Sequence, residues 1–129
     1  MSEPIDDYDE IVRICGLYME GGSKGDVGKL KEAFHEDARM FGQIDSLRYD
    51  MPITEYFDLV VARPAGTGAY RGRVLSVQQV GAAAMAVVAE DGYWGTISFI
   101  DFLSLVRIDG TWKIVNKTFE YTGGEPPAA

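Results

Sequence analysis

The sequence predicts an α+β fold in which N-terminal helices pack on one face of a curved antiparallel sheet. Helical periodicity is confined to the first half of the chain, and β-rich runs separated by short turns fill the second half. Proline is absent from residues 65–125, so no residue there removes a donor from a sheet ladder. Strands that follow one another through short turns pair as an antiparallel meander.

Three amphipathic helices are expected before the sheet, because apolar residues recur there at three- and four-residue steps. Aspartate precedes each helix as an N-terminal cap, and glycine or proline follows two of them. The expected helices run from the caps Asp6 and Asp7 to Gly21-Gly22, from Asp26 to His35, and from Asp50 to the stop at Arg63-Pro64.

Four strands are expected beyond Gly68, at residues 69–80, 82–90, 93–107 and 112–121. Gly81, Asp91-Gly92 and Asp109-Gly110 separate them, and these are residues that favour tight turns. The whole chain, residues 1–129, is therefore expected to form one domain with an ordered core of about residues 6–121.

Composition narrows the classes of partner. The net charge of −8 disfavours nucleic acid and anionic lipid, and no apolar run approaches the roughly 20 residues that cross a bilayer. The first residues lack the pattern of a secretory signal, so a cytoplasmic protein is expected. With one cysteine, Cys15, and one histidine, His35, the chain has no set of ligands for a thiolate or histidine metal site, and no cofactor is expected.

The last hairpin places polar groups on one face of the sheet. If Asp109-Gly110 is a two-residue turn, Leu103 pairs with Asn116 and Asp101 with Thr118. Asp101, Asn116 and Thr118 then point toward the helices. A bulge of one residue would exchange the two faces and turn Lys117 inward instead.

The second face of this hairpin is also apolar. Phe102, Val115, Phe119 and Tyr121 would lie on it, which is more apolar area than a monomer normally leaves in water. We therefore expect a homodimer formed sheet to sheet, and an interaction module that uses this face for another protein is an alternative.

The chain resembles the nuclear transport factor 2 (NTF2) superfamily over residues 6–121. The resemblance rests on Phe34 to Ala38 after the helix that starts at Asp26, on the middle helix, and on residues 101–117 with Asp-Gly-Thr-Trp at the turn. Within it the chain is similar to the group called putative lumazine-binding proteins, close to the polyketide-cyclase-like branch. The resemblance implies a cone, in which a curved sheet encloses helices and opens onto a cavity. It implies no single activity.

Asp101 is the candidate acid or base, because a carboxyl between Ile100 and Phe102 must be paired, raised in pKa or in contact with a wet cavity. The resemblance offers ketosteroid isomerases as a precedent, with Tyr18 or Tyr56 in the part of the oxyanion donor. His35 is expected at a helix end in a local role. The expected lining of the pocket is Tyr18, Met40, Met51, Ile53, Tyr56, Phe57, Phe99, Trp112, Asn116 and Thr118.

The first functional hypothesis is a protein that binds a small apolar or aromatic molecule, oriented by Asp101, Asn116 and Thr118. The alternative is a cofactor-free isomerase, cyclase or dehydratase in which Asp101 moves a proton next to a carbonyl group.

Overall fold

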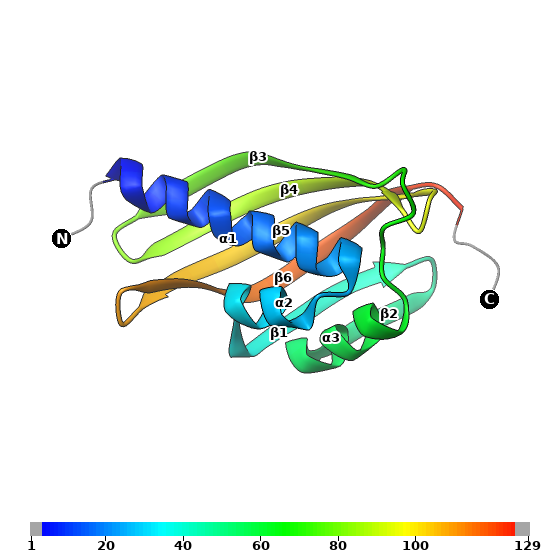
Figure 1. The fold of residues 1–129 in the computed structure, drawn as a ribbon, viewed down its shortest axis with the longest axis horizontal. Coiled ribbons are helices and arrows are strands. Elements are labelled where there is room, and N and C mark those ends of the chain that lie inside the picture. The colour runs from blue at the N-terminus through cyan, green and yellow to red at the C-terminus, as the bar shows by residue number, and fades with distance from the viewer. Residues whose placement is uncertain (1–3, 126–129) are drawn as a thin grey trace.

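The computed structural model describes residues 4–125, in which three helices lie over one face of a six-stranded sheet (Figure 1). This arrangement confirms the predicted α+β class. None of the helices in these residues is long and apolar enough to cross a membrane. The helices are α1 (Pro4–Lys24), α2 (Val27–Ala33) and α3 (Ile53–Ala62), and the strands are β1 (Phe34–Ile44), β2 (Leu47–Pro52), β3 (Arg71–Val80), β4 (Ala83–Tyr93), β5 (Ile97–Ile108) and β6 (Thr111–Gly123).

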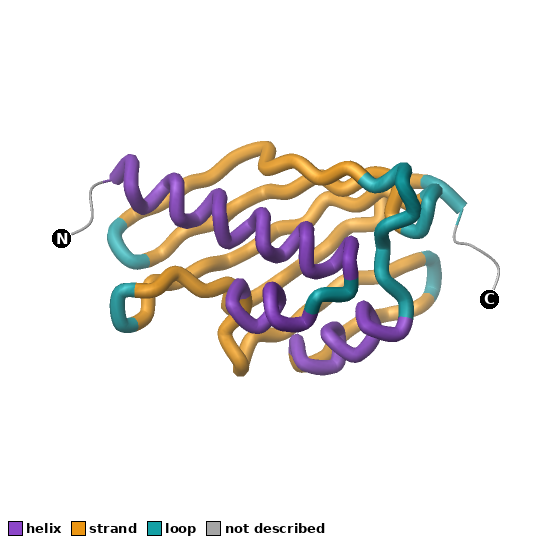
Figure 2. The backbone as a smooth tube through the Cα atoms, in the orientation of Figure 1, coloured by secondary structure: helices purple, strands orange, loops and turns teal. Residues whose placement is uncertain are grey.

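The strands are ordered β2-β1-β6-β5-β4-β3 across the sheet. The four from β3 to β6 form the predicted antiparallel meander, whereas β1 pairs with β6 in the parallel direction. The long helix α1 runs along the sheet, and α2 and α3 lie beside it on the same face (Figure 2). The core is therefore the layer between these helices and the inner face of the sheet.

Residues 34–52 form two strands that sequence reasoning did not predict. Helix α2 ends at Ala33, because Phe34 is already extended with φ −102° and ψ 143°. Ala38 and Met40 then turn inward while Arg39 between them faces outward, which is the period-2 pattern of a strand. Pro52 ends the outer strand β2, where a missing donor is tolerated. The sheet therefore extends beyond the proline-free residues 65–125.

Helix α1 continues through Gly21-Gly22, where the sequence predicted its end, and stops at Lys24. Gly21 instead allows close packing between helices. A Cβ atom at this position would lie 2.7 Å from the Leu30 side chain of α2. Gly21 is therefore a contact point between α1 and α2. The end of the helix is marked instead by Gly25, which follows Lys24 and has a left-handed φ of 70°.

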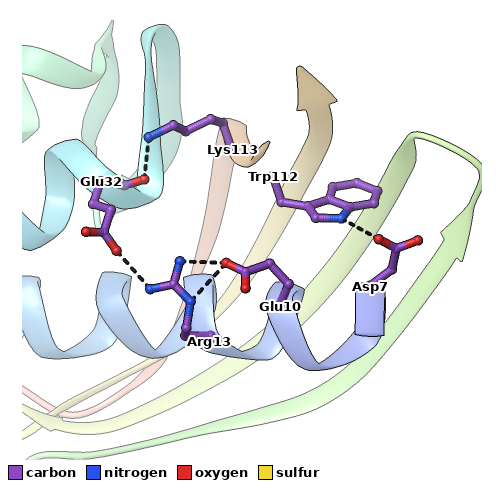
Figure 3. Close-up of polar contacts among 6 residues, drawn as sticks. All are labelled: Asp7, Glu10, Arg13, Glu32, Trp112 and Lys113. Carbon is purple, nitrogen blue, oxygen red and sulfur yellow. Dashed lines mark hydrogen bonds and ion pairs between the residues drawn. The ribbon is translucent and has the colours of Figure 1, made fainter. Parts of the chain in front are cut away.

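Asp7 joins the first turn of α1 to the last hairpin, although the sequence predicted only a cap there (Figure 3). Its buried carboxylate accepts hydrogen bonds from Arg107 at 3.0 Å and from the Trp112 indole nitrogen at 3.1 Å. Trp112 was expected to line the pocket, and the structure places its indole nitrogen against Asp7. A surface pair, Arg13 with Glu32 at 2.8 Å, also links α1 to α2.

A β-bulge in β6 corrects the predicted register of the last hairpin. Leu105 faces Ile114 as predicted, but Ser104 faces Asn116, so Val115 is an additional residue in β6. Beyond the bulge Leu103 pairs with Lys117 and Asp101 with Phe119. Because one extra residue exchanges the faces, Lys117 and Phe119 point inward. Asn116 and Thr118 lie on the outer side, where they hydrogen-bond to each other at 3.0 Å.

Candidate functional site

A cavity of about 230 Å³ lies between α3, the β1–β2 hairpin and the inner face of β4, β5 and β6. Its walls are mainly aliphatic and aromatic, with a small polar group set among them. An apolar pocket with few convergent polar groups is the usual form of a small-molecule site. The lining residues are Met40, Ile44, Tyr49, Tyr56, Leu59, Val60, Ala62, Arg63, Glu90, Tyr93, Trp94, Phe99, Asp101, Lys117 and Phe119.

Two carboxyl groups form the polar part of the wall. Asp101 on β5 and Glu90 on β4 are 1% and 3% exposed. The sheet brings them together because Asp101 pairs with Val88, two residues before Glu90, so both point to the same face. The Tyr18 hydroxyl of α1 lies 2.7 Å from Asp101 Oδ2 and 2.9 Å from Glu90 Oε1, and Tyr70 donates to Glu90 Oε2 at 2.6 Å.

The contacts among Tyr18, Asp101 and Glu90 require more than one proton. Tyr18 carries one hydroxyl proton and can donate it to only one of the two carboxyl groups. The second contact is a hydrogen bond only when a carboxyl group is itself protonated. Burial, followed by the nearby charge of Glu90, raises the pKa of Asp101 well above its ordinary value, against the opposing effect of Lys117 and Tyr18. Burial therefore favours the protonated form of Asp101, whose proton can supply the second hydrogen bond between the two carboxyl groups and Tyr18.

Lys117 places a nitrogen on the same wall. The bulge in β6 turns its side chain inward, where the residue is 4% exposed. Nζ lies 4.0 Å from the centre of the Tyr56 ring and 4.9 Å from that of Tyr18. These are cation–π distances. Burial lowers the pKa of Lys117, although Asp101 and Glu90 oppose this shift.

The tyrosines of the site remain protonated donors. Burial raises the pKa of Tyr18 and of Tyr56 well above the ordinary value, and nearby carboxyl groups act in the same direction. Tyr70 and Tyr93 also have a raised pKa, first because of burial and then because of Glu90. These hydroxyl groups can therefore hydrogen-bond an oxygen of a ligand or of a carboxylate.

The predicted site residues fall into three groups. Asp101, Met40, Tyr56 and Phe99 line the cavity, and Tyr18 lies behind it as the partner of Asp101. Ile53 and Phe57 are buried in the core beside the cavity, and Met51 is half-buried on β2. Asn116, Thr118 and Trp112 do not reach the cavity, the first two because of the bulge and the third because it contacts Asp7.

Sequence reasoning missed Glu90 and placed Lys117 inward only as an alternative. The signal for Glu90 was its phase, because it continues the two-residue alternation of the buried Ala86 and Val88. Lys117 had no such signal, since a single extra residue in β6 decides its face.

Two other candidates lie away from the cavity. His35 is partly exposed and accepts a hydrogen bond from the Asp37 backbone at 3.0 Å, which is a local role. Cys15 is buried in α1, and burial raises the pKa of its thiol to about 12. Among residues 4–125, His, Cys, Asp and Glu side chains do not gather in a group of three or more that could hold a metal ion.

The fold and its cavity define a protein of the NTF2-like class. An NTF2-like protein of unknown function from Shewanella baltica OS155 is 28% identical, with a TM-score of 0.86 over 96% of this chain and 100% of that one. An NTF2-like protein of unknown function from Methylobacillus flagellatus KT is 29% identical, with a TM-score of 0.86 over 95% and 97%. A cystatin-like protein from Nostoc punctiforme, 15% identical with a TM-score of 0.71 over 96% of each chain, shares the fold.

The particular family follows from the sequence match. The family described as "Putative lumazine-binding" matches residues 6–120, so the chain belongs to this family. The chain is also 27% identical to "Aldolase FrzH" from Cladobotryum sp. over 113 residues, which cover 88% of this chain and 90% of that protein.

Proposed function

We propose that the cavity binds a small, largely apolar carbonyl compound and that Asp101 moves a proton to or from the carbon next to the carbonyl group. The observation that carries this proposal is the buried carboxyl of Asp101 on the wall of an apolar cavity, 2.7 Å from the Tyr18 hydroxyl. Such proton transfers require a group whose pKa lies near the working pH, and burial shifts the pKa of Asp101 in that direction.

The composition of the cavity supports the substrate class. Apart from Arg63 and the polar cluster, the lining consists of aliphatic and aromatic residues, which favour an apolar ligand. Asp101 and Lys117 lie on the same wall, so a carbonyl group held there meets both an acid–base group and a nitrogen. Enolisation, aldol addition and double-bond isomerisation all begin with such a proton transfer.

The similarity to a protein named an aldolase agrees with this class of chemistry. Forming or breaking a carbon–carbon bond next to a carbonyl group requires the same removal or return of a proton. We therefore place the proposed enzyme among those that act through an enol or an equivalent intermediate.

Hydrogen exchange tests the proposal without knowledge of the natural substrate. Apolar ketones such as 2-tetralone and phenylacetone are incubated with the protein in D2O, and loss of the α-hydrogen signal is followed by proton NMR. We expect Asp101→Asn to slow the enzyme-dependent exchange by about 100-fold or more, because Asn neither gives nor accepts that proton. Equal exchange in Asp101→Asn and the parent protein would refute the role of Asp101.

A matched substitution separates chemistry from folding. Asp58→Asn makes the same change at an exposed position of α3 and is expected to leave exchange unchanged. Near-ultraviolet circular dichroism and chemical-shift changes on addition of 2-tetralone should show that Asp101→Asn still folds and binds the probe.

A further inference from the structure

Lys117 is placed differently from the other lysines whose contacts the structure describes. Lys24 and Lys29 lie 2.9 Å from the carboxylate of Glu20, and Lys113 donates to the Glu32 carbonyl at 2.6 Å. Lys117 is buried on the cavity wall, and within residues 4–125 its nitrogen has no carboxylate within the 4.0 Å of an ion pair. Its closest described contacts are aromatic rings.

A purely structural role explains this placement poorly. A buried ammonium group without a paired carboxylate has a large desolvation cost, and contacts with aromatic rings offset only part of that cost. Methionine or leucine would fill the space between Tyr18, Tyr56 and Phe119 without that cost. Groups that cost stability inside a pocket are often retained for chemistry.

We propose that Lys117 is a nucleophile that forms a Schiff base with the carbonyl carbon of the substrate. This inference rests on the proposed function, because it names how the same cavity activates its carbonyl compound. Three features of the geometry support it. The nitrogen lines the cavity, it is not held in an ion pair among residues 4–125, and the carboxyl group of Asp101 lies on the same wall.

Lys117 and Asp101 provide the nucleophile and the proton transfers that this reaction needs. The neutral amine of Lys117 adds to the carbonyl carbon, the electron pair of the C=O bond moves to oxygen, and a proton passes from nitrogen to that oxygen. Asp101 then donates its proton to the hydroxyl group, which leaves as water and forms the iminium ion. The resulting Asp101 carboxylate removes the α-proton and forms the enamine. Asp101 then returns a proton to the enamine carbon, which forms the iminium ion again. Water adds to the iminium carbon and gives its proton to the Asp101 carboxylate, and collapse of the adduct releases the carbonyl product and the neutral amine of Lys117.

The electrostatic surroundings favour the neutral amine that this reaction needs. Burial lowers the pKa of Lys117 below its ordinary value of 10.5, so a larger fraction of this amine is neutral at a given pH than for an exposed lysine. The carboxyl groups of Asp101 and Glu90 oppose this lowering of the Lys117 pKa. The titratable or charged groups that face this nitrogen or line the same cavity are Tyr18, Tyr49, Tyr56, Arg63, Glu90, Tyr93 and Asp101.

Reductive trapping tests the proposal. The protein is incubated with 2-tetralone and sodium cyanoborohydride, and intact mass spectrometry should show an increase equal to the mass of the probe less one oxygen atom. Peptide mapping should place this adduct on Lys117, at a rate about 10-fold or more above that of any other lysine. An adduct spread evenly over Lys24, Lys29, Lys31, Lys113 and Lys117 would overturn the assignment.

Two variants provide the controls. Lys117→Met is expected to fold, as judged by circular dichroism, and to lose the adduct. Lys31→Met removes an exposed lysine and should leave trapping at Lys117 unchanged. If Lys117→Met does not fold, the peptide map of the parent protein still shows whether the adduct lies on Lys117.

The experiments separate this inference from the proposed function. Exchange that depends on Asp101 without any adduct at Lys117 would leave the proposed function standing and overturn the Schiff base. An adduct at Lys117 without exchange would support the nucleophile and count against the role of Asp101 in proton transfer.

Discussion

Asp101 couples the candidate chemistry to stability. Its pKa in the folded protein is raised above the ordinary 3.8, first by burial and then by Glu90. The folded protein therefore keeps a proton that the unfolded chain has lost, and the free energy of unfolding decreases as pH rises from about 4 toward the folded pKa. This stabilisation is fully present below the pKa that Asp101 has in the unfolded chain. It is lost as the pH rises through the pKa that Asp101 has in the folded protein.

Asp101→Asn should remove this dependence, because an amide has no proton to lose in this range. Urea unfolding of both proteins at a series of pH values from about 4 to 8 measures the difference. The stability of the parent relative to the variant should fall by up to about 1.4 kcal/mol per pH unit within the window. Curves that stay parallel over this range would show that Asp101 titrates alike in the folded and unfolded chains.

Among single residues, the sequence identified Asp101 as a candidate but did not predict its hydrogen-bond partners. A carboxyl group between two apolar residues of a predicted strand is conspicuous, because it cannot be buried without a reason. Tyr18 was expected to line the pocket, and the resemblance made it a possible oxyanion donor, but its hydrogen bond to Asp101 was not predicted. Glu90 was recognised only as the end of a strand. Their convergence depends on how α1 crosses β4 and β5, which local patterns do not encode.

Among the elements, β1 and β6 pack tightly at Gly42. This residue pairs with Phe119, and a Cβ atom at Gly42 would collide with the Phe119 ring. That ring lines the cavity and stands edge-on to Tyr49 and Phe99, with centroids 5.6 and 5.4 Å away. The parallel pairing of β1 with β6 therefore sets the position of one cavity wall.

Gly42→Ala should push Phe119 toward the cavity. We expect the free energy of unfolding to decrease by about 2 kcal/mol, as for other overpacked sites, and binding of 2-tetralone to weaken. Chemical denaturation and NMR titration measure the two effects. Gly16→Ala is the matched control, since a Cβ there meets nothing within 4 Å and should stabilise α1 by up to about 1 kcal/mol. Unchanged stability of Gly42→Ala would mean that the strands move apart freely.

The elements also show what local patterns can and cannot predict. The meander from β3 to β6 followed from its turn residues, and the three helices followed from their apolar periodicity. The hairpin of β1 and β2 was missed because its strands have polar outer faces and one of them contains a proline. The bulge at Val115 was missed because it depends on pairing between strands, and it alone decided which face Lys117 occupies.

For the whole molecule, the two ends of the helical layer differ in their contacts. At one end Asp7 fixes α1 to the last hairpin through Arg107 and Trp112. At the other end α3 and the β4–β5 turn border the cavity, where Trp94 donates to the Arg63 carbonyl at 3.2 Å and stacks under its guanidinium group. The polar network at the first end stabilises the fold, and the aromatic layer at the second surrounds the candidate site.

The three helices lie on one face of the sheet, and no described helix covers the other face (Figure 1). That outer face carries exposed apolar residues. Val80, Met85 and Phe102 are 85%, 46% and 43% exposed. They come from three neighbouring strands, and Phe102 pairs with Val87 beside Met85. The bulge removed Phe119 and Tyr121 from the surface predicted for this face, yet the exposed residues on β3, β4 and β5 remain. We propose that a second copy of the chain covers them around a twofold axis.

Phe102→Asp should disrupt such a dimer, because the twofold axis places the new carboxylate in the interface of both copies, where it is desolvated. Light scattering after size exclusion should give the parent protein twice the mass of one chain, and the variant should dissociate with a dissociation constant raised about 100-fold or more. Val61→Lys places a charge on an exposed position of α3, on the helical side, and should leave the mass unchanged. A parent protein that is monomeric at micromolar concentration would refute the dimer and leave the outer face for a different partner.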